Sequence, residues 1–173
     1  MSAATLIRAL STARSVMSGE SWTHAIVRVE PGKERRVSED LEDFLYPYDQ
    51  SVSARPTRYN GLVLLRCRLG RGELLRLIES SGVGYVRGVK VLDGLVPLSD
   101  WAGALRVIMR LVPAGGAINL KVRVRGGERG AEAVLHRLCA GLERAGYALV
   151  SEGGVVVELE TIDGCLAISV RNT

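Results

Sequence analysis

The chain has 173 residues, 47% of them hydrophobic, and its 23 Lys and Arg against 19 Asp and Glu give a formal net charge of +4. A chain of this length and apolar content can bury a substantial core, which excludes intrinsic disorder. The sequence has no window of about 18 uncharged apolar residues and predicts no membrane span. A net charge this small does not identify a binding partner, so the local distribution of charge is the more informative signal.

The three cysteines, Cys67, Cys139 and Cys165, are odd in number, far apart and each within an apolar run. This pattern favours free thiols in a reducing compartment, and we expect a cytoplasmic protein. Residues 1–22 lack an uninterrupted apolar segment, which argues against a secretory signal, while their Arg and Ser content leaves a transit peptide open. We expect an N-terminal extension here, with a short amphipathic helix.

Residues 23–96 have the hydrophobic pattern of a first compact unit. Apolar residues recur at helical spacing in two segments, and Pro47 ends the first of these helices. Asn60-Gly61 is a tight-turn signal between two strands. Strands are expected at residues 24–29, 50–54, 62–69 and 85–91, and helices around residues 37–45 and 72–80. This βαββαβ order is ferredoxin-like, so an α+β fold is predicted.

Residues 97–173 form the second expected unit. Ser99 is the expected N-cap of a helix, because its hydroxyl can accept a hydrogen bond from an otherwise unpaired amide. A strand from Ile118 to Arg125 follows, and then a helix with Gly146 as its C-cap. Two further strands, residues 155–162 and 165–170, pair across the turn Asp163-Gly164.

The strand from Ile118 to Arg125 carries the strongest functional signal. Its side chains alternate, so Leu120, Val122 and Val124 are expected in the core, and the opposite face presents three cations, namely Lys121, Arg123 and Arg125. Like charges in a row repel one another unless an anion compensates them, and guanidinium groups match phosphate oxygens well. Nucleic acid is therefore the first partner to consider.

The loop after this strand contains a second candidate. Gly126 and Gly127 are expected at the start of a helix, where unpaired amides attract an anion that Arg129 can also reach. The simpler alternative is that the glycines only let the strand turn into the helix. The sequence Gly127 to Gly130 also spells the GXXG loop of KH domains, but that loop joins two helices, whereas here a strand precedes it.

Three further cations are candidate contacts. Arg106 and Arg110 lie four residues apart on one helix face, where exposed arginines are as often only solvated. Lys90, near Arg87, lies on the strand that leads into the second unit.

Catalytic signatures are missing from the sequence. His24 and His136 have no Cys, Asp or Glu partner at metal-ligand spacing, and no HExxH, paired CxxC, GxSxG or phosphate-binding loop occurs. We therefore expect no enzyme activity, no metal and no cofactor.

The second unit resembles a THUMP domain, a tRNA-binding module found beside tRNA-modifying enzymes. The resemblance lies in the basic strand and the apolar strands around it, namely Val96-Pro97-Leu98, residues 120–125, residues 155–159 and residues 167–170. No catalytic domain is expected beyond the last strand. The chain is most similar to the stand-alone THUMP proteins that partner the tRNA cytidine acetyltransferase, in which a ferredoxin-like domain commonly precedes the THUMP domain.

The resemblance implies a non-catalytic adaptor that holds the acceptor end of tRNA, with its 3′ CCA, and presents the tRNA to a separate modifying enzyme, an acetyltransferase. It implies no membrane contact and a monomer in isolation. Two alternatives remain open. The first unit can belong to a protein-interaction or regulatory module that does not bind RNA, or the chain can be a detached RNA-binding domain of another tRNA-modifying enzyme.

Overall fold

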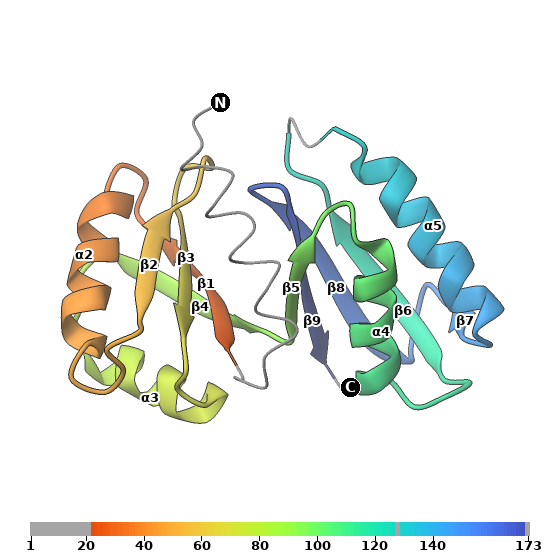
Figure 1. Cartoon of the computed structure of the whole chain (residues 1–173), viewed down its shortest axis with the longest axis horizontal. Coiled ribbons are helices and arrows are strands. Elements are labelled where there is room, and N and C mark those ends of the chain that lie inside the picture. The colour runs from red at the N-terminus through yellow and green to blue at the C-terminus, as the bar shows by residue number, and fades with distance from the viewer. Residues whose placement is uncertain (1–21, 127–128, 172–173) are drawn as a thin grey trace.

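The computed structural model describes residues 22–126 and 129–171. These residues form two β-sheets, each covered by helices on its outer face, and the uncovered faces of the two sheets turn toward each other (Figure 1). The α+β class expected from the sequence is confirmed. The expected helix within residues 1–22 falls almost entirely outside the described residues.

The first sheet is antiparallel, with strand order β2-β3-β1-β4. Its elements follow one another in the expected βαββαβ order: β1 (Thr23–Val29), α2 (Glu34–Leu45), β2 (Ser53–Pro56), β3 (Leu62–Cys67), α3 (Arg71–Ser80) and β4 (Val86–Leu92). Gly61, just before β3, has φ +74° and so provides the left-handed conformation that its position in the turn requires.

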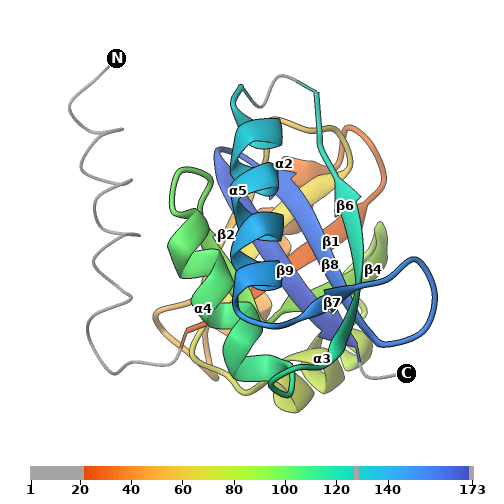
Figure 2. The ribbon, with the colours of Figure 1, turned by 90° about the vertical axis from the view of Figure 1, so that its right-hand side faces the viewer.

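The second sheet has strand order β5-β9-β8-β6-β7, and β6 runs parallel to both of its neighbours. Its elements are β5 (Gly94–Pro97), α4 (Trp101–Leu111), β6 (Ala117–Arg123), α5 (Ala131–Arg144), β7 (Ala148–Leu149), β8 (Val155–Ile162) and β9 (Cys165–Arg171). Figure 2 shows α4 and α5 lying over the outer face of this sheet. The change of sheet occurs at Asp93, between β4 and β5.

Alternation along the strands gives each sheet a helix-covered face and an inner face. In β1, Ala25 and Val27 are fully buried under the helices, whereas Ile26 between them points to the second sheet. In β8, Val157 and Leu159 pack beneath α4 and α5. The other faces of these two strands therefore meet between the sheets.

We call the apolar contact between the inner faces the inter-sheet seam. Its buried members are Ile26, Leu62, Leu64 and Leu92 from the first sheet and Ile162 and Ala167 from the second. A polar anchor closes one end, because the carboxylate of Asp163 accepts from Arg55 Nη1 at 2.6 Å and from the Arg58 amide at 3.1 Å. Asp163 lies in the β8–β9 turn with φ +48°, followed by Gly164 at +77°, which confirms the expected hairpin turn.

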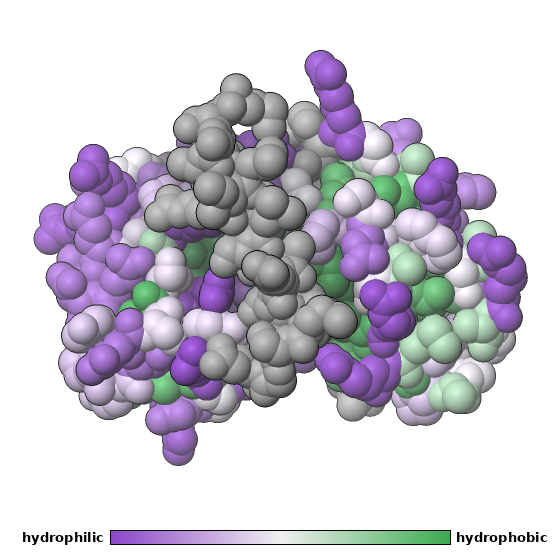
Figure 3. All heavy atoms as spheres, in the orientation of Figure 1, coloured by the Kyte–Doolittle hydropathy of each residue, from purple (hydrophilic) through white to green (hydrophobic). Residues whose placement is uncertain are grey.

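A second anchor joins the sheets at Asp93. One oxygen of its carboxylate accepts from the Val170 amide at 2.7 Å, and the other accepts from Arg71 Nη1 at 2.7 Å. The two anchors and the seam hold the inner faces in a fixed relation. Away from the seam, hydrophilic residues gather on the outer side of the first sheet near α2, whereas apolar residues are more frequent over α4 (Figure 3).

Several expectations about the second unit are wrong in detail. The N-cap of α4 is Asp100, whose carboxylate accepts from the Gly103 amide at 2.8 Å, and not Ser99. Val122 and Val124 are not core residues but are 42% and 45% exposed. Only the first half of β6 packs into the core of the second unit, where Ile118 is buried and Leu120 is half-buried.

Strands β5 and β7 were not expected from the sequence. β5 pairs with β9, and β7 pairs only with Ala117 and Ile118 of β6. Both are short segments whose existence depends on partners distant in the sequence.

One titratable group couples this fold to pH. His24 lies on the inner face of β1, where burial and, secondarily, the nearby Arg66 cation lower its pKa from 6.5 to about 4. The unfolded chain therefore takes up a proton between these values that the folded chain does not.

We expect the contribution of His24 to the free energy of unfolding to be fully present above pH 6.5 and to fall as the pH is lowered toward 4. The loss due to His24 should be at most about 2 kcal/mol between pH 7.5 and pH 5. Urea denaturation at several pH values measures it. His24→Gln should flatten the dependence between pH 7.5 and 5, and an unchanged slope in this variant would show that His24 is not responsible.

Candidate nucleic-acid interface

Beside the seam, the two inner faces enclose a cavity of about 560 Å³, which we call the inter-sheet cleft. Both sheets contribute cations to its lining: Arg28, Arg71, Lys90, Lys121, Arg123, Arg125 and Arg171. The only acids among the lining residues are Glu158 and Glu160. Seven cations against two carboxylates give the cleft a formal charge of +5, whereas the whole chain carries +4. The basic character of the protein is thus concentrated here.

Strand β6 and the two residues that follow it bring the three expected cations to this cleft. Lys121, Arg123 and Arg125 all line it, so the expectation that they share one face holds. In the parallel pairing of β6 with β8, Lys121 lies beside Glu158 and Arg123 lies beside Glu160. Carboxylates of the protein itself therefore stand next to the row of cations.

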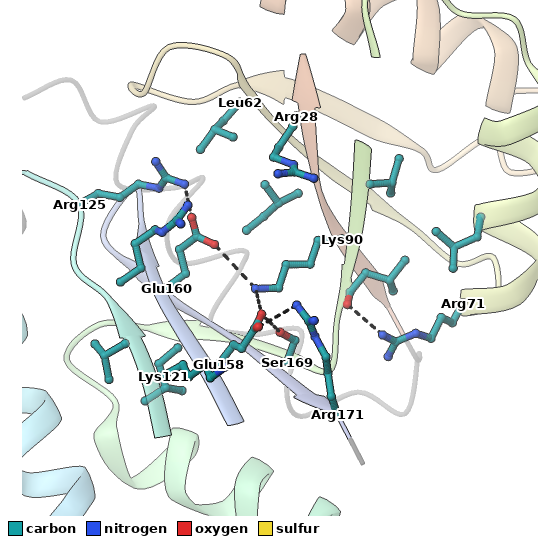
Figure 4. Close-up of a pocket in the computed structure, with 17 residues that line it drawn as sticks. Arg28, Leu62, Arg71, Lys90, Lys121, Arg125, Glu158, Glu160, Ser169 and Arg171 are labelled. Atoms are coloured by element: carbon teal, nitrogen blue, oxygen red, sulfur yellow. Dashed lines mark hydrogen bonds and ion pairs between the residues drawn. The ribbon is translucent and has the colours of Figure 1, made fainter. Parts of the chain in front are cut away.

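The two carboxylates are held by cations of β4 and β9 and by Arg125, which lies just beyond the end of β6 (Figure 4). Glu158 accepts from Lys90 Nζ at 2.6 Å and pairs with Arg171 Nη2 at 2.7 Å. Glu160 pairs with Arg125 and lies 3.9 Å from Lys90 Nζ. Lys90 comes from the first sheet, so its ammonium group ties the two sheets together across the cleft.

These ion pairs determine the protonation state of Glu158 in the cleft. Burial by itself raises the pKa of the Glu158 carboxyl, but the hydrogen bond and charge of Lys90 and the charge of Arg171 outweigh burial. The pKa therefore lies below its ordinary value, and Glu158 is ionised at neutral pH.

Arg125 is fixed more firmly than its neighbours. Its backbone amide donates to Thr161 Oγ1 at 2.8 Å, and its guanidinium lies 5.4 Å from the centre of the Tyr59 ring. The Tyr59 hydroxyl lies 3.5 Å from the carbonyl oxygen of Gly126. The end of the cleft nearest the β2–β3 loop is thus built from both halves of the chain.

Three cations of the cleft differ from the rest. Arg28, Lys121 and Arg123 are exposed, and within residues 22–126 and 129–171 none of them makes an ion pair. Their charges remain available to an anion from solution, whereas those of Lys90, Arg125 and Arg171 are already matched by carboxylates.

The other predicted site residues lie elsewhere. Arg106 and Arg110 are on α4, do not line the cleft, and Arg106 lies 4.0 Å from Asp100. Arg87, beside Lys90 in the sequence, points away from the cleft lining and pairs with Glu30 at 2.9 Å.

The expected anion site at the start of a helix is not formed as predicted. β6 ends at Arg123 and α5 begins only at Ala131, after Gly130 in a left-handed conformation at φ +80°. Gly126 therefore lies several residues before the helix, and its amide is not at the helix N-terminus. Gly127 lies outside the described residues, and Arg129 is an exposed loop residue.

The sequence interpretation missed five charged residues of the cleft, namely Arg28, Arg71, Arg171, Glu158 and Glu160. A signal was present for some of them. Glu158 and Glu160 alternate with apolar residues in an otherwise apolar strand, as Lys121 and Arg123 do in theirs. Two strands that alternate charged and apolar residues in this way, one with cations and one with carboxylates, indicate a shared polar face of the sheet.

Within the described residues, no group of three or more His, Cys, Asp or Glu residues could hold a metal ion. None of the helices in that part of the chain is both long and apolar enough to cross a membrane.

No protein-family model matches the sequence, and no curated protein matches it. Solved structures of similar fold include TrmN from Thermus thermophilus, at 20% identity and a TM-score of 0.51, over 87% of this chain and 46% of that one. They also include a 4-thiouridine synthetase in a complex with RNA and bound ATP, at 14% identity and a TM-score of 0.53, over 87% of this chain and 41% of that one.

The chain thus spans less than half the length of either of these two proteins. At such identities the likeness concerns the fold alone. It extends over both sheets and supports the THUMP-like fold expected from the sequence.

Proposed function

We propose that this protein is a non-catalytic tRNA-binding adaptor that presents tRNA to a separate modifying enzyme. The observation that carries the proposal is the inter-sheet cleft, in which Arg28, Lys121 and Arg123 present charges with no partner among the described residues. Cations kept close together without carboxylates are suited to a chain of phosphates, which can match several of them at once.

The shape of the site favours a single strand over a duplex. The cleft is a partly open space of about 560 Å³ between two sheets, which is small for an RNA duplex. Single-stranded ends of RNA expose phosphates and 2′-hydroxyls that such a cavity can follow. We therefore assign it to the 3′ CCA of the acceptor end. That a 4-thiouridine synthetase of similar fold was solved with RNA supports the ligand class.

In this proposal the first sheet with α2 and α3 is a ferredoxin-like domain and the second sheet with α4 and α5 is the THUMP domain. The boundary lies at Asp93, slightly earlier than residue 96, because β5 pairs with β9 of the second sheet. The enzyme partner is a tRNA cytidine acetyltransferase, the location is the cytoplasm, and the chain alone is a monomer. No metal or cofactor takes part in binding.

A second candidate is a detached RNA-binding domain that serves another tRNA-modifying enzyme. The observation behind it is that the chain spans 46% and 41% of the two proteins of similar fold. Under this alternative the cleft has the same ligand, and only the partner differs. A regulatory module without RNA binding would instead leave the three unpaired cations without a role.

Replacing Lys121 and Arg123 together by Gln should weaken tRNA binding. Each lost charged hydrogen bond contributes roughly 1.5 to 3 kcal/mol, and the slope of log affinity against log salt should become shallower by roughly 1.4. Folding should persist, because both side chains are exposed and make no ion pair in the described part of the chain. Fluorescence anisotropy at several salt concentrations gives both quantities.

The matched control is the double variant Arg35→Gln/Arg36→Gln, which removes the same charge from the exposed face of α2. It should bind tRNA almost as the original protein does. If the cleft variant is folded and keeps its salt slope, the cleft is not the RNA site.

Trimming the 3′ CCA from tRNA should reduce its affinity far more than removing the anticodon arm, because the cleft is assigned to the single-stranded end. Gel-shift titrations of the two truncated RNAs compare the losses. Equal losses would instead indicate general binding of duplex RNA.

The purified protein should produce no modified nucleoside when incubated with tRNA and common group donors, because we assign it binding and not chemistry. Nucleoside analysis by mass spectrometry checks this, and the candidate acetyltransferase supplied together with the protein is the positive arm. A new nucleoside formed by the protein alone would contradict the adaptor role.

A further inference from the structure

Glu158 and Glu160 are unusual residues for the floor of a cationic cleft. Alternation in β8 turns both toward the first sheet, and their side chains are only 19% and 10% exposed. Carboxylates so far removed from water are costly unless cations match them. If the cleft served only to attract anions, two acids in its centre would oppose that task.

The two carboxylates occupy the places where ligand oxygens would otherwise be held. Lys90 and Arg171 lie 2.6 and 2.7 Å from the oxygens of Glu158, and Arg125 pairs with Glu160. A carboxylate and a phosphate offer guanidinium and ammonium groups the same kind of charged acceptor. These two carboxylates therefore match three of the seven cations, and Asp93 matches a fourth, Arg71.

Some N–H donors of these cations have no hydrogen-bond acceptor among the described residues. Arg125 Nε is buried without a hydrogen-bond partner, and Lys90 Nζ is 3.9 Å from the nearer oxygen of Glu160. A guanidinium has five N–H donors and an ammonium has three, so Lys90 and the accessible part of the Arg125 guanidinium can each donate to a further anion. The arrangement is thus a partly filled anion site with the protein's own carboxylates in it.

We propose that Glu160, with Glu158 beside it, competes with phosphate for the cations of the cleft and thereby sets the affinity of the cleft for phosphate. The inference rests on the proposed function. In the free protein the carboxylates hold Lys90, Arg125 and Arg171 in place. A bound phosphodiester gains most of its affinity from Arg28, Lys121 and Arg123. At Lys90, Arg125 and Arg171 it has to compete with the carboxylates, and replacing one anion by another at a cation contributes little binding energy.

The competitor makes the cleft selective for a chain of phosphates. A single phosphate meets cations that are already matched, whereas a chain can contact the unpaired cations of both sheets at once. It also keeps binding reversible, as is needed by an adaptor that must release its RNA.

Glu160→Gln tests this in the full-length protein, because the amide keeps the size of the side chain and an acceptor for Arg125 but removes the charge. Affinity for tRNA should rise about tenfold. The salt slope should steepen by roughly 0.7, the value for one more phosphate contact. Glu39→Gln is the matched control, since it removes the same charge from an exposed pair with Arg35 on α2, and it should leave both quantities almost unchanged.

Inorganic polyphosphate is the second probe, because it carries phosphates without RNA structure. If the original protein binds tRNA no better than polyphosphate, the proposed function fails. The competitor nevertheless predicts tighter polyphosphate binding by Glu160→Gln.

Thermal melting shows whether each variant is folded. If Glu160→Gln does not fold, Glu158→Gln is tested in its place, and we expect it to raise the affinity for both probes as well. Folded variants whose affinity for both probes is unchanged or lower would overturn the inference. The carboxylates would then serve only to hold the cleft in shape.

Discussion

The apolar contact between the inner faces of the two sheets is the constraint on which the rest of this structure depends. Ile26 and Leu92 on one side and Ile162 and Ala167 on the other exclude water from the seam. Because the sheets are held there and at the Asp163 anchor, strands that are remote in the sequence line one cavity. Without the seam, Lys90 would not reach the carboxylates of β8, and the cations of β1 and β6 would not share a ligand.

Charge in the cleft is divided between two tasks. The buried carboxylates and their cations fix positions, since each pair is specified by short distances and by the strands that carry it. The exposed cations Arg28, Lys121 and Arg123 supply attraction, which acts at longer range and weakens with salt. This division explains how a protein with a net charge of only +4 can concentrate positive potential at one place.

The first half of the chain contributes to the site in a way that its composition conceals. Its helix α2 carries many acids, yet several are engaged locally: Glu42 accepts from the Ala54 amide at 2.7 Å, and Glu34 accepts from the Gly61 amide. These two acidic side chains thus hold strand β2 and the turn before β3 against α2. Two cations of this half, Arg28 and Lys90, lie on the inner face and line the cleft with the second sheet.

The sequence by itself determined what local physics controls. The β8–β9 hairpin was predicted because Asp163-Gly164 can adopt positive φ angles, and the shared face of Lys121, Arg123 and Arg125 follows from the two-residue period of a strand. Tertiary structure alone decided which faces are covered. Val122 and Val124 alternate as core residues do, but neither packs against the core of the second unit, and β5 exists only because β9, some seventy residues later, pairs with it. The alternation of Glu158 and Glu160 marks a polar face, but the cations that match them were decided only by tertiary structure, since a carboxylate in a strand acquires its cations only when the sheets meet.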